Sequence, residues 1–381
     1  MGKHLVIVGA GTGGLMVANA VGRSLEQGME RGEVSVTVLG DRDEYVYQPG
    51  FLYLAFDLMR PNELARKVRD LLRPGIRFVH DRAARVDADR KEVHTQGGQV
   101  LSYDYLVLAT GSDIHPSEVP GLQEGGHWFY TLAGAVRLRD TLRQFTGGRV
   151  VLTVGVPHKC PVAPLEFILM FDDWARARGI RGDCEITYTY PIGRAHTIPA
   201  VAEWAQAQLE ARGIRVETFF NMTEVDPDAK SVGSLEGTTL SYDLLVAIPP
   251  HVGDRLGADS GLAEAGNWLP TDRHNLNLVG RDDVFVLGDA TNLPVSKAGS
   301  VAHFEAEVLA QNLVGLLADG APLKHRYSGK VFCFIEAGME KATFITFDYD
   351  HPPLVSPPTQ SVHWFKQTYN RIHWLNLKGI L

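Results

Sequence analysis

The sequence predicts an α/β protein made of two Rossmann-like domains, the second inserted in the first, and a C-terminal β/helical region with an amphipathic helix. A glycine loop joins a strand to a helix near the N-terminus, and "LSYDLLVAIPP" (240–250) repeats "LSYDYLVLATG" (101–111), which indicates a duplicated unit. The length of 381 residues suits two domains or more. The predicted boundaries are 1–112 with 260–325 for the first domain, 113–259 for the second and 326–381 for the C-terminal region.

The composition is that of a folded protein, with 45% apolar and 22% charged residues. The net charge of −8 argues against a nucleic-acid partner. The first apolar stretch runs straight into the glycine loop, so we expect no cleavable signal peptide, and no apolar run is long enough to span a bilayer. Cys160, Cys184 and Cys333 are too few for a disulfide scaffold, so any pairing is expected to be catalytic; no metal site is predicted.

The first element is the loop in "HLVIVGAGTGGLMVANA" (4–20), with Gly9, Gly11 and Gly14 between a strand and a helix. Glycines permit the tight turn, and the free N–H groups of the helix N-terminus attract a pyrophosphate. A second strand, "EVSVTVLGDRD", follows, and Asp41 or Asp43 after it could bind a ribose hydroxyl.

Two later strands end in similar turns: "LSYDYLVLATGS" at Thr110 and Gly111, and "RDDVFVLGDATNL" at Gly288 and Asp289. With the first loop, they resemble the signatures of FAD-binding flavoproteins with two dinucleotide-binding domains. The resemblance covers nearly the whole chain and implies FAD, with Asp289 on the ribityl or pyrophosphate groups. Lys297, just before a long predicted helix, would stabilise negative charge on the reduced flavin.

In the repeated unit, the place of the second glycine loop reads "VGVPHKCPVAP" (154–164). Pro157 and Pro161 each lack a backbone donor, which disfavours a nicotinamide dinucleotide here. The loop instead carries Cys160, beside a predicted helix that contains Glu166. A thiol near a helix N-terminus and basic neighbours is expected to have a lowered pKa.

Cys333 lies in the apolar segment "GKVFCFIEAG", and Cys184 starts a predicted strand where packing is its expected role. At this point the chain resembles the sulfide:quinone oxidoreductases, through the FAD motifs, Cys160 in the second loop followed by Glu166, "KAGSVAHFEAE" and "CFIEAG". The resemblance implies a disulfide or polysulfide between Cys160 and Cys333 that accepts sulfide, with Cys333 as the thiol that reacts with the flavin and with quinone as the final acceptor.

The same resemblance implies further site residues. His127 and His196 would move protons on the sulfide side, as would Glu166. Phe332, Phe334 and Ile335 would line the quinone site, with ordinary core packing as the alternative. Pro49, in "YVYQPGF", is expected at the flavin, which must be noncovalent there because no cysteine precedes Cys160. Many members carry a third cysteine in a segment corresponding to 112–130, and this chain has none.

The tail is the last expected element. Residues 351–381 contain no Asp or Glu. Helical spacing groups the apolar residues Trp364, Phe365, Tyr369, Ile372 and Leu375, with Lys366, Arg371 and Lys378 around them. Aromatic and basic residues on one amphipathic helix indicate an anchor on a membrane surface; docking on the core or on a partner subunit is the alternative.

The sequence therefore predicts a peripheral membrane flavoenzyme, expected on the cytoplasmic side, that oxidises sulfide to polysulfide or sulfur and reduces membrane quinone; assembly as a homo-oligomer is left open. Three alternatives remain: the flavoprotein subunit of a sulfide dehydrogenase that passes electrons to a cytochrome, an NADH:quinone oxidoreductase, and a flavin and thiol redox sensor without turnover.

Overall fold

The computed structural model describes residues 2–380 and confirms the predicted α/β class. Its largest sheet is fully parallel, with the strand order β19-β9-β1-β2-β5. The continuous apolar runs suit strands that are buried on both faces. The strands are β1 (Lys3–Val8), β2 (Val34–Gly40), β5 (Arg77–His80), β9 (Tyr105–Leu108) and β19 (Val284–Val286). Strands from both ends of the chain thus share one sheet.

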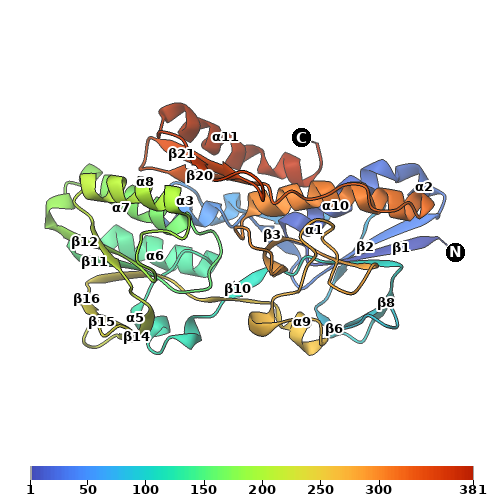
Figure 1. The fold of residues 1–381 in the computed structure, drawn as a ribbon, viewed down its shortest axis with the longest axis horizontal. Helices are drawn as coiled ribbons and strands as arrows, with labels where there is room; N and C mark the ends of the chain where they lie inside the picture. The colour runs from blue at the N-terminus through green and yellow to red at the C-terminus, as the bar shows by residue number, and fades with distance from the viewer. Residues whose placement is uncertain (1, 381) are drawn as a thin grey trace.

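A second parallel sheet has the order β13-β12-β11-β17. Its strands are β11 (Gly148–Val154), β12 (Cys184–Tyr190), β13 (Arg215–Thr218) and β17 (Leu244–Ile248). β17 follows the second copy of the repeated "LSYD" motif, as β9 follows the first. Figure 1 shows the two sheets in opposite halves of an elongated molecule.

Each half also contains a three-stranded antiparallel sheet that precedes the repeated strand, which is the structural counterpart of the sequence repeat. One is formed by β6 (Ala83–Asp87), β7 (Glu92–Thr95) and β8 (Val100–Ser102), the other by β14 (Met222–Asp226), β15 (Ser231–Ser234) and β16 (Thr239–Ser241). The two connections between the halves pair as antiparallel strands, β10 (Ser112–Ile114) and β18 (His251–Gly253). A further short pair is β3 (Glu44–Val46) with β4 (Ala65–Lys67).

The helices cover both sheets. α1 (Thr12–Ser24) buries Leu15, Val17 and Val21 and packs against α10 (Gly299–Asp319), which begins just after Lys297 as expected. The other helices of six residues or more before the tail are α3 (Gly50–Ala55), α6 (Leu132–Gln144), α7 (Ala163–Ala177) and α8 (Pro199–Ala211). The short helices are α2 (Glu26–Glu30), α4 (Val68–Leu71), α5 (Leu122–Gly125) and α9 (Arg255–Asp259).

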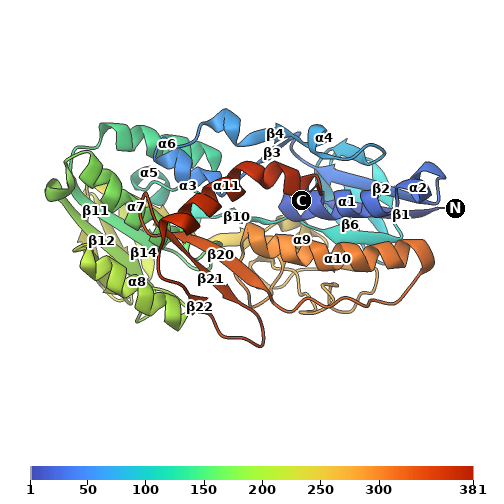
Figure 2. The same cartoon turned by 90° about the horizontal axis from the view of Figure 1, so that it is seen from above.

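The C-terminal region lies over the junction of the two halves (Figures 1 and 2). It consists of the antiparallel strands β20 (Val331–Glu336), β21 (Ala342–Phe347) and β22 (Leu354–Val355), followed by α11 (Gln360–Leu377). One continuous apolar core joins Leu5 of the first sheet, Val150 of the second and Ile335 of the C-terminal region. Within residues 2–380, none of the helices combines the length and the hydropathy that a membrane crossing requires.

Candidate active site

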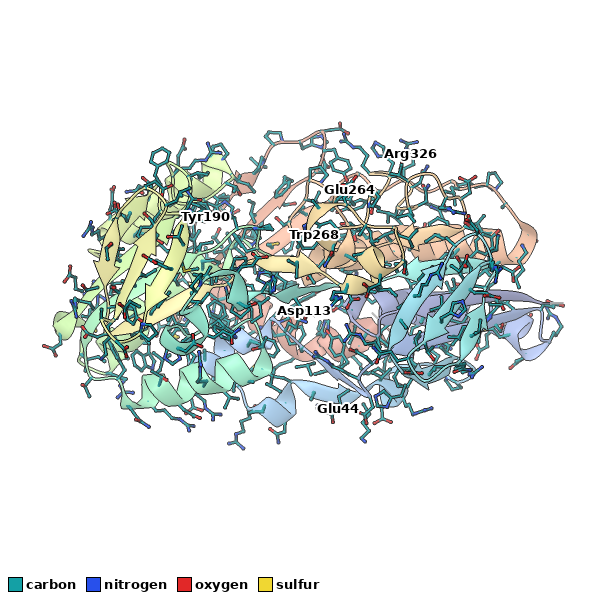
Figure 3. All side chains as sticks on the ribbon, turned by 90° about the horizontal axis from the view of Figure 1, so that it is seen from below. Glu44, Asp113, Tyr190, Glu264, Trp268 and Arg326 are labelled. Atoms are coloured by element: carbon teal, nitrogen blue, oxygen red, sulfur yellow. The ribbon has the colours of Figure 1, made fainter. Side chains whose placement is uncertain are left out.

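A cleft of about 650 Å³ collects residues from the first sheet, the loop after β11, the strand β20 and the helix α11. Figure 3 labels two of its lining residues, Glu44 and Asp113, with Asp113 in the middle of the molecule and Tyr190 on the side of the second sheet. The cleft brings together most of the residues predicted from the sequence: Gly9, Gly11, Asp41, Pro49, Thr110, Gly111, Cys160, Glu166, Gly288, Asp289, Lys297, Phe332, Cys333 and Phe334. Gly14, His127, His196 and Ile335 are not part of its lining.

The glycine loop leaves bare backbone open to this cleft. A Cβ on Gly9 would lie 2.2 Å from Ala109 O, and one on Gly14 would lie 2.0 Å from Gly9 O, so these two glycines allow the turn itself. A Cβ on Gly11 would meet no protein atom within 4 Å. No side chain caps α1, which begins at Thr12. The N–H groups of its first turn and the space beside Gly11 therefore fit a pyrophosphate.

The strand ends beside this loop fit the other parts of a dinucleotide. Asp41 lines the cleft at the end of β2, whereas Asp43 is engaged by Lys67, with 3.6 Å between Nζ and Oδ2. Asp41 is therefore the better placed of the two candidates for a ribose hydroxyl. The Ser112 hydroxyl, also in the lining, is buried without a hydrogen-bond partner.

Glu305 lies outside the cleft lining but supports the turn at Gly288, a role that the sequence did not predict. It is fully buried on α10, and its Oε2 accepts a hydrogen bond of 2.5 Å from Gly288 N. Burial raises the pKa of Glu305 to about 8. Gly288 has a φ of +73°, so the carboxyl group holds a turn that needs glycine, directly before Asp289. A glutamate within a helical pattern gives no sequence signal for this role.

Lys159 connects the second half to Asp289. Its Nζ donates to Gln48 Oε1 at 2.8 Å and lies 3.7 Å from Asp289 Oδ2, and the residue is 8% exposed. From the sequence, Lys159 is predicted only as one of the basic neighbours of the thiol. Its length lets it cross the cleft from the loop after β11 to the first half.

Lys297 holds the turn after β19. Its Nζ donates to the carbonyl oxygens of Asp289, at 3.1 Å, and Thr291, and lies 4.1 Å from the Trp268 ring centroid. Burial lowers the pKa of Lys297. Its ammonium is thus satisfied by backbone acceptors, and its action on a reduced flavin stays a prediction.

Cys160 is held in a tightly fixed loop. Its φ is +49°, in the left-handed region that costs a non-glycine residue about 1 kcal/mol or more. Cys160 N donates to Lys297 O at 2.8 Å, and the Tyr130 hydroxyl donates to Cys160 O at 3.2 Å. These bonds connect the loop to both halves, and they hold the strained backbone in place.

Cys333 reaches the same cleft from β20. Its Sγ lies 3.7 Å from Ser300 Oγ in the first turn of α10, and the residue is 9% exposed. Cys160 and Cys333 are both free thiols in this structure. Cys184 is not in the cleft; its Sγ donates to Ile180 O at 3.3 Å, which fits the packing role expected of it.

The expected lowering of the Cys160 pKa is wrong. Burial raises it well above the ordinary range, and Glu166 adds to the effect. Burial likewise raises the pKa of Cys333 to about 11. The prediction overestimated the helix N-terminus and the basic neighbours, because the Lys159 ammonium points to Gln48 and Asp289 and the thiol is desolvated.

The two predicted histidines are not part of the cleft lining, and their role in proton transfer stays a prediction. Burial lowers the pKa of His127 to about 4 and that of His196 to about 4. His127 forms a bridge with Val246 in the second sheet. His196 accepts a hydrogen bond from Ile198 N at 3.0 Å and stacks on Tyr190. Both are neutral near pH 7, where a proton carrier should titrate.

Glu166 lines the cleft as predicted, and it forms an ion pair with Lys366, which the sequence had placed on the outside of the tail helix. Lys366, placed by the sequence analysis on the outer basic face of the tail helix, is 8% exposed, and its Nζ contacts Glu166 Oε1. The sequence pattern could not show that this lysine points inward, because its ion-pair partner is 200 positions away.

The inner side of α11 carries mostly polar side chains, whereas two large aromatic side chains of this helix are exposed. The helix buries Lys366, Asn370 and His373 against the cleft and exposes Trp364 and Phe365 by 61% and 68%. Hydrogen bonds tie this inner face to the first half: Tyr47 Oη donates to Asn370 Oδ1 at 2.7 Å, and Tyr45 Oη lies 2.6 Å from His373 Nε2 and 3.0 Å from Thr12 Oγ1.

Aromatic side chains line the part of the cleft next to α11. Phe332 and Phe334 alternate with Cys333 on β20, with their ring centroids 4.9 Å apart, and Phe334 lies 6.2 Å from the Phe365 ring. Ile335 points to the other face of the sheet and is fully buried in the core. The prediction placed Phe334 and Ile335 together, whereas the alternation of a β-strand separates them.

The chain is similar to known proteins in sequence and in fold. Residues 3–157 match the pyridine nucleotide-disulphide oxidoreductase family. The chain is 24% identical to the mitochondrial sulfide:quinone oxidoreductase of Mus musculus over 99% of this chain and 83% of that protein, and 26% identical to that of Dictyostelium discoideum over 91% and 77%. The fold matches the crystal structure of the sulfide:quinone oxidoreductase of Aquifex aeolicus with a TM-score of 0.88 and 23% identity, over 99% of this chain and 92% of that one.

FAD is the cofactor of these flavoproteins, and the bare glycine loop, the uncapped α1 and Asp41 fit it. Residues 3–157 of the chain thus resemble the pyridine nucleotide-disulphide oxidoreductases, and the relatives named here that match it over most of its length are sulfide:quinone oxidoreductases.

Proposed function

We propose that this protein oxidises sulfide and reduces quinone, with FAD between the two reactions. The observation that carries the proposal is that Cys160 and Cys333, which are 173 positions apart (333 − 160), line the same cleft as the glycine loop. Bound FAD supplies a two-electron carrier next to this pair. The relatives named above as sulfide:quinone oxidoreductases support the assignment of both substrates.

The two thiols receive the sulfur. In their oxidised form they are a disulfide; hydrosulfide attacks one sulfur, a new S–S bond forms, and the other cysteine leaves as a thiolate. Overall, HS⁻ + H⁺ + quinone gives S⁰ + quinol, with two electrons passing from sulfur to quinone. Lys366 lowers the pKa of both thiols against the larger effect of burial, so it stabilises the departing thiolate.

The aromatic end of the cleft is the proposed quinone site. Phe332, Phe334 and Phe365 offer flat apolar surfaces, and α11 exposes Trp364 and Phe365 on its outer side. We propose that this outer side lies on the membrane surface, from which a lipid-soluble quinone enters. Trp364 is suited to the boundary between lipid and water.

An anaerobic experiment tests the proposal. The holoprotein is mixed with sulfide, and separately with NADH, and the flavin absorbance is followed before and after a soluble quinone is added. We expect bleaching by sulfide, reversed by quinone. Cys160→Ser and Cys333→Ser should slow bleaching about 100-fold or more, and Cys184→Ser, the matched control, should not.

Two results would overturn the assignment. Bleaching by NADH and not by sulfide would make the protein an NADH:quinone oxidoreductase. Sulfide bleaching that quinone does not reverse would indicate another electron acceptor or a sensor without turnover.

A further inference from the structure

A continuous series of polar side chains leads from the cleft to the surface. Its outer members, Glu336 and His363, have no role in the reaction proposed above. The series starts at Glu166 and Lys366, which line the cleft, and passes through Glu336 to His363. Glu336 is fully buried, whereas the His363 side chain is 16% exposed. The series therefore begins in the cleft and ends in solvent.

Two of the three steps are direct contacts, and the third is an ion pair at 4.0 Å. His363 Nδ1 lies 2.8 Å from Glu336 Oε2. On the other side of this carboxylate, Lys366 Nζ lies 4.0 Å from Glu336 Oε1, and it directly contacts Glu166 Oε1. Tyr53 Oη, which donates to Glu336 Oε1 at 2.6 Å, keeps the carboxylate oriented.

The charges in this series do not balance. Two buried carboxylates, Glu166 and Glu336, share a single ammonium. Burial opposes the charge on Lys366, but Glu166 and Glu336 outweigh it and raise the pKa of Lys366. Burial raises the pKa of Glu166 in spite of Lys366. A second proton therefore has a place to bind here, which a fully paired cluster would not offer.

The groups that face this cluster come from four elements. Besides Glu166 of α7 and Glu336 of β20, they are Tyr53 of α3, Tyr47 before it, His363, Lys366 and Tyr369 of α11, and the thiols Cys160 and Cys333. Among these, His363 carries a titratable group that touches solvent and pairs with a buried carboxylate.

We infer that Glu336 and His363 are the proton entrance of the active site. The inference rests on the proposed function, in which each turnover takes up one proton: the hydrosulfide proton and one solvent proton end on the two quinol oxygens. Lys366 gives a proton to Glu166 Oε1 and is then reprotonated from Glu336, His363 passes a proton from Nδ1 to Glu336 Oε2, and His363 is reloaded from solvent. The apolar outer side of α11, with Trp364 and Phe365, gives no alternative path once it faces lipid.

The test compares His363→Ala and Glu336→Gln with His351→Ala. His351 is the matched control, because its Nδ1 also lies 2.8 Å from a carboxylate, Asp348, but on an exposed loop. We expect the two variants to slow flavin reoxidation by quinone about tenfold or more, with bleaching by sulfide changed less than twofold. Added imidazole should restore His363→Ala and not Glu336→Gln. Normal reoxidation in both variants, or loss that imidazole does not restore in His363→Ala, would overturn the inference.

A second readout needs no turnover. The infrared ammonium band of Lys366, identified by its loss in Lys366→Met, should exchange more slowly after dilution into D₂O in His363→Ala than in the wild type or His351→Ala. Equal exchange rates in His363→Ala and the wild type would overturn the inference that protons enter through His363. If sulfide fails to bleach the flavin while His363→Ala still slows the exchange, the proposed function fails and the proton entrance stands.

Discussion

Arg212 joins Asp172 to the turn that follows Glu336. Its Nη1 donates to Asp172 Oδ2 at 2.8 Å, and its Nη2 donates to the carbonyl of Ala337 at 2.7 Å. Asp172 lies on α7, the helix that contains Glu166, so this one arginine ties the C-terminal strands to the second half of the molecule.

Asp172→Asn should destabilise the fold. Asp172 is fully buried and also accepts hydrogen bonds from Arg176 and Arg181, so the variant leaves arginines without their carboxylate. Breaking a buried pair costs about 3–5 kcal/mol, and the melting temperature should fall by about 5 °C or more. Asp89→Asn, which removes an exposed pair with Arg281, should change it by less than about 1 °C. Calorimetry of the two variants measures both melting temperatures. Similar values for Asp172→Asn and Asp89→Asn would contradict the stabilising role of Asp172.

The stabilisation of the fold by Asp172 should depend on pH. Burial opposes the charge on Asp172, but hydrogen bonds from Arg176, Arg181 and Arg212 outweigh it and lower its pKa. Because the pKa is lower in the folded state, this stabilisation is complete above the unfolded value of about 3.9 and is lost as the pH falls through the lower folded value. The difference in melting temperature between wild type and Asp172→Asn should therefore shrink below about pH 4, as measured from pH 7 to pH 3. A constant difference would be inconsistent with this role.

Gly11→Ala and Gly14→Ala should separate cofactor binding from folding. A Cβ on Gly11 meets no protein atom within 4 Å, so Gly11→Ala should leave the melting temperature of the apoprotein unchanged but lower its flavin content. A Cβ on Gly14 would lie 2.0 Å from Gly9 O, so Gly14→Ala should lower both. Flavin absorbance per protein and apoprotein melting curves provide the comparison. Full flavin content in Gly11→Ala would mean that the pyrophosphate does not approach this glycine.

The reduced thiols should react slowly with iodoacetamide near pH 7. Burial raises the pKa of Cys333 to about 11 and raises that of Cys160 further, so both are protonated at neutral pH. Mass spectrometry of each cysteine should show alkylation rates that still increase above pH 9. A rate that levels off below pH 8 at either thiol would show a stabilised thiolate instead.

Trp364→Ser should weaken binding to phospholipid vesicles about tenfold, as expected for removing one large apolar side chain from a lipid interface. Phe219→Ser is the matched control, because Phe219 is 62% exposed, close to the 61% of Trp364, but belongs to the second half. Vesicle sedimentation measures both. Equal binding of the two variants would show that the outer side of α11 is not the contact.

The parallel sheets, the glycine loop and the thiol loop could be predicted because their signals are local. Apolar runs, glycines at fixed spacing and the repeated "LSYD" motif need only neighbouring residues. Contacts between residues far apart in the sequence could not be predicted from such local patterns. Lys366 looked like part of an outer basic face because its partner Glu166 is 200 positions earlier.

Protonation states could not be predicted from sequence for the same reason. The helix N-terminus and basic neighbours of Cys160 favour a thiolate, whereas burial, which depends on the whole cleft, reverses the result. His127 and His196 are comparable cases: their residue type suits proton transfer, but their surroundings keep them neutral.

The pairing of β19 with β9 sets an order for biosynthesis. The first sheet, whose strand ends line the cleft, is incomplete until residues 284–286 have left the ribosome, and Cys333 and α11 emerge later still. A nascent chain that ends before β19 contains the glycine loop but only part of the flavin site. FAD can therefore bind to a complete site only after most of the chain has been synthesised. Chains that are released from the ribosome before β19 should lack bound flavin and be colourless.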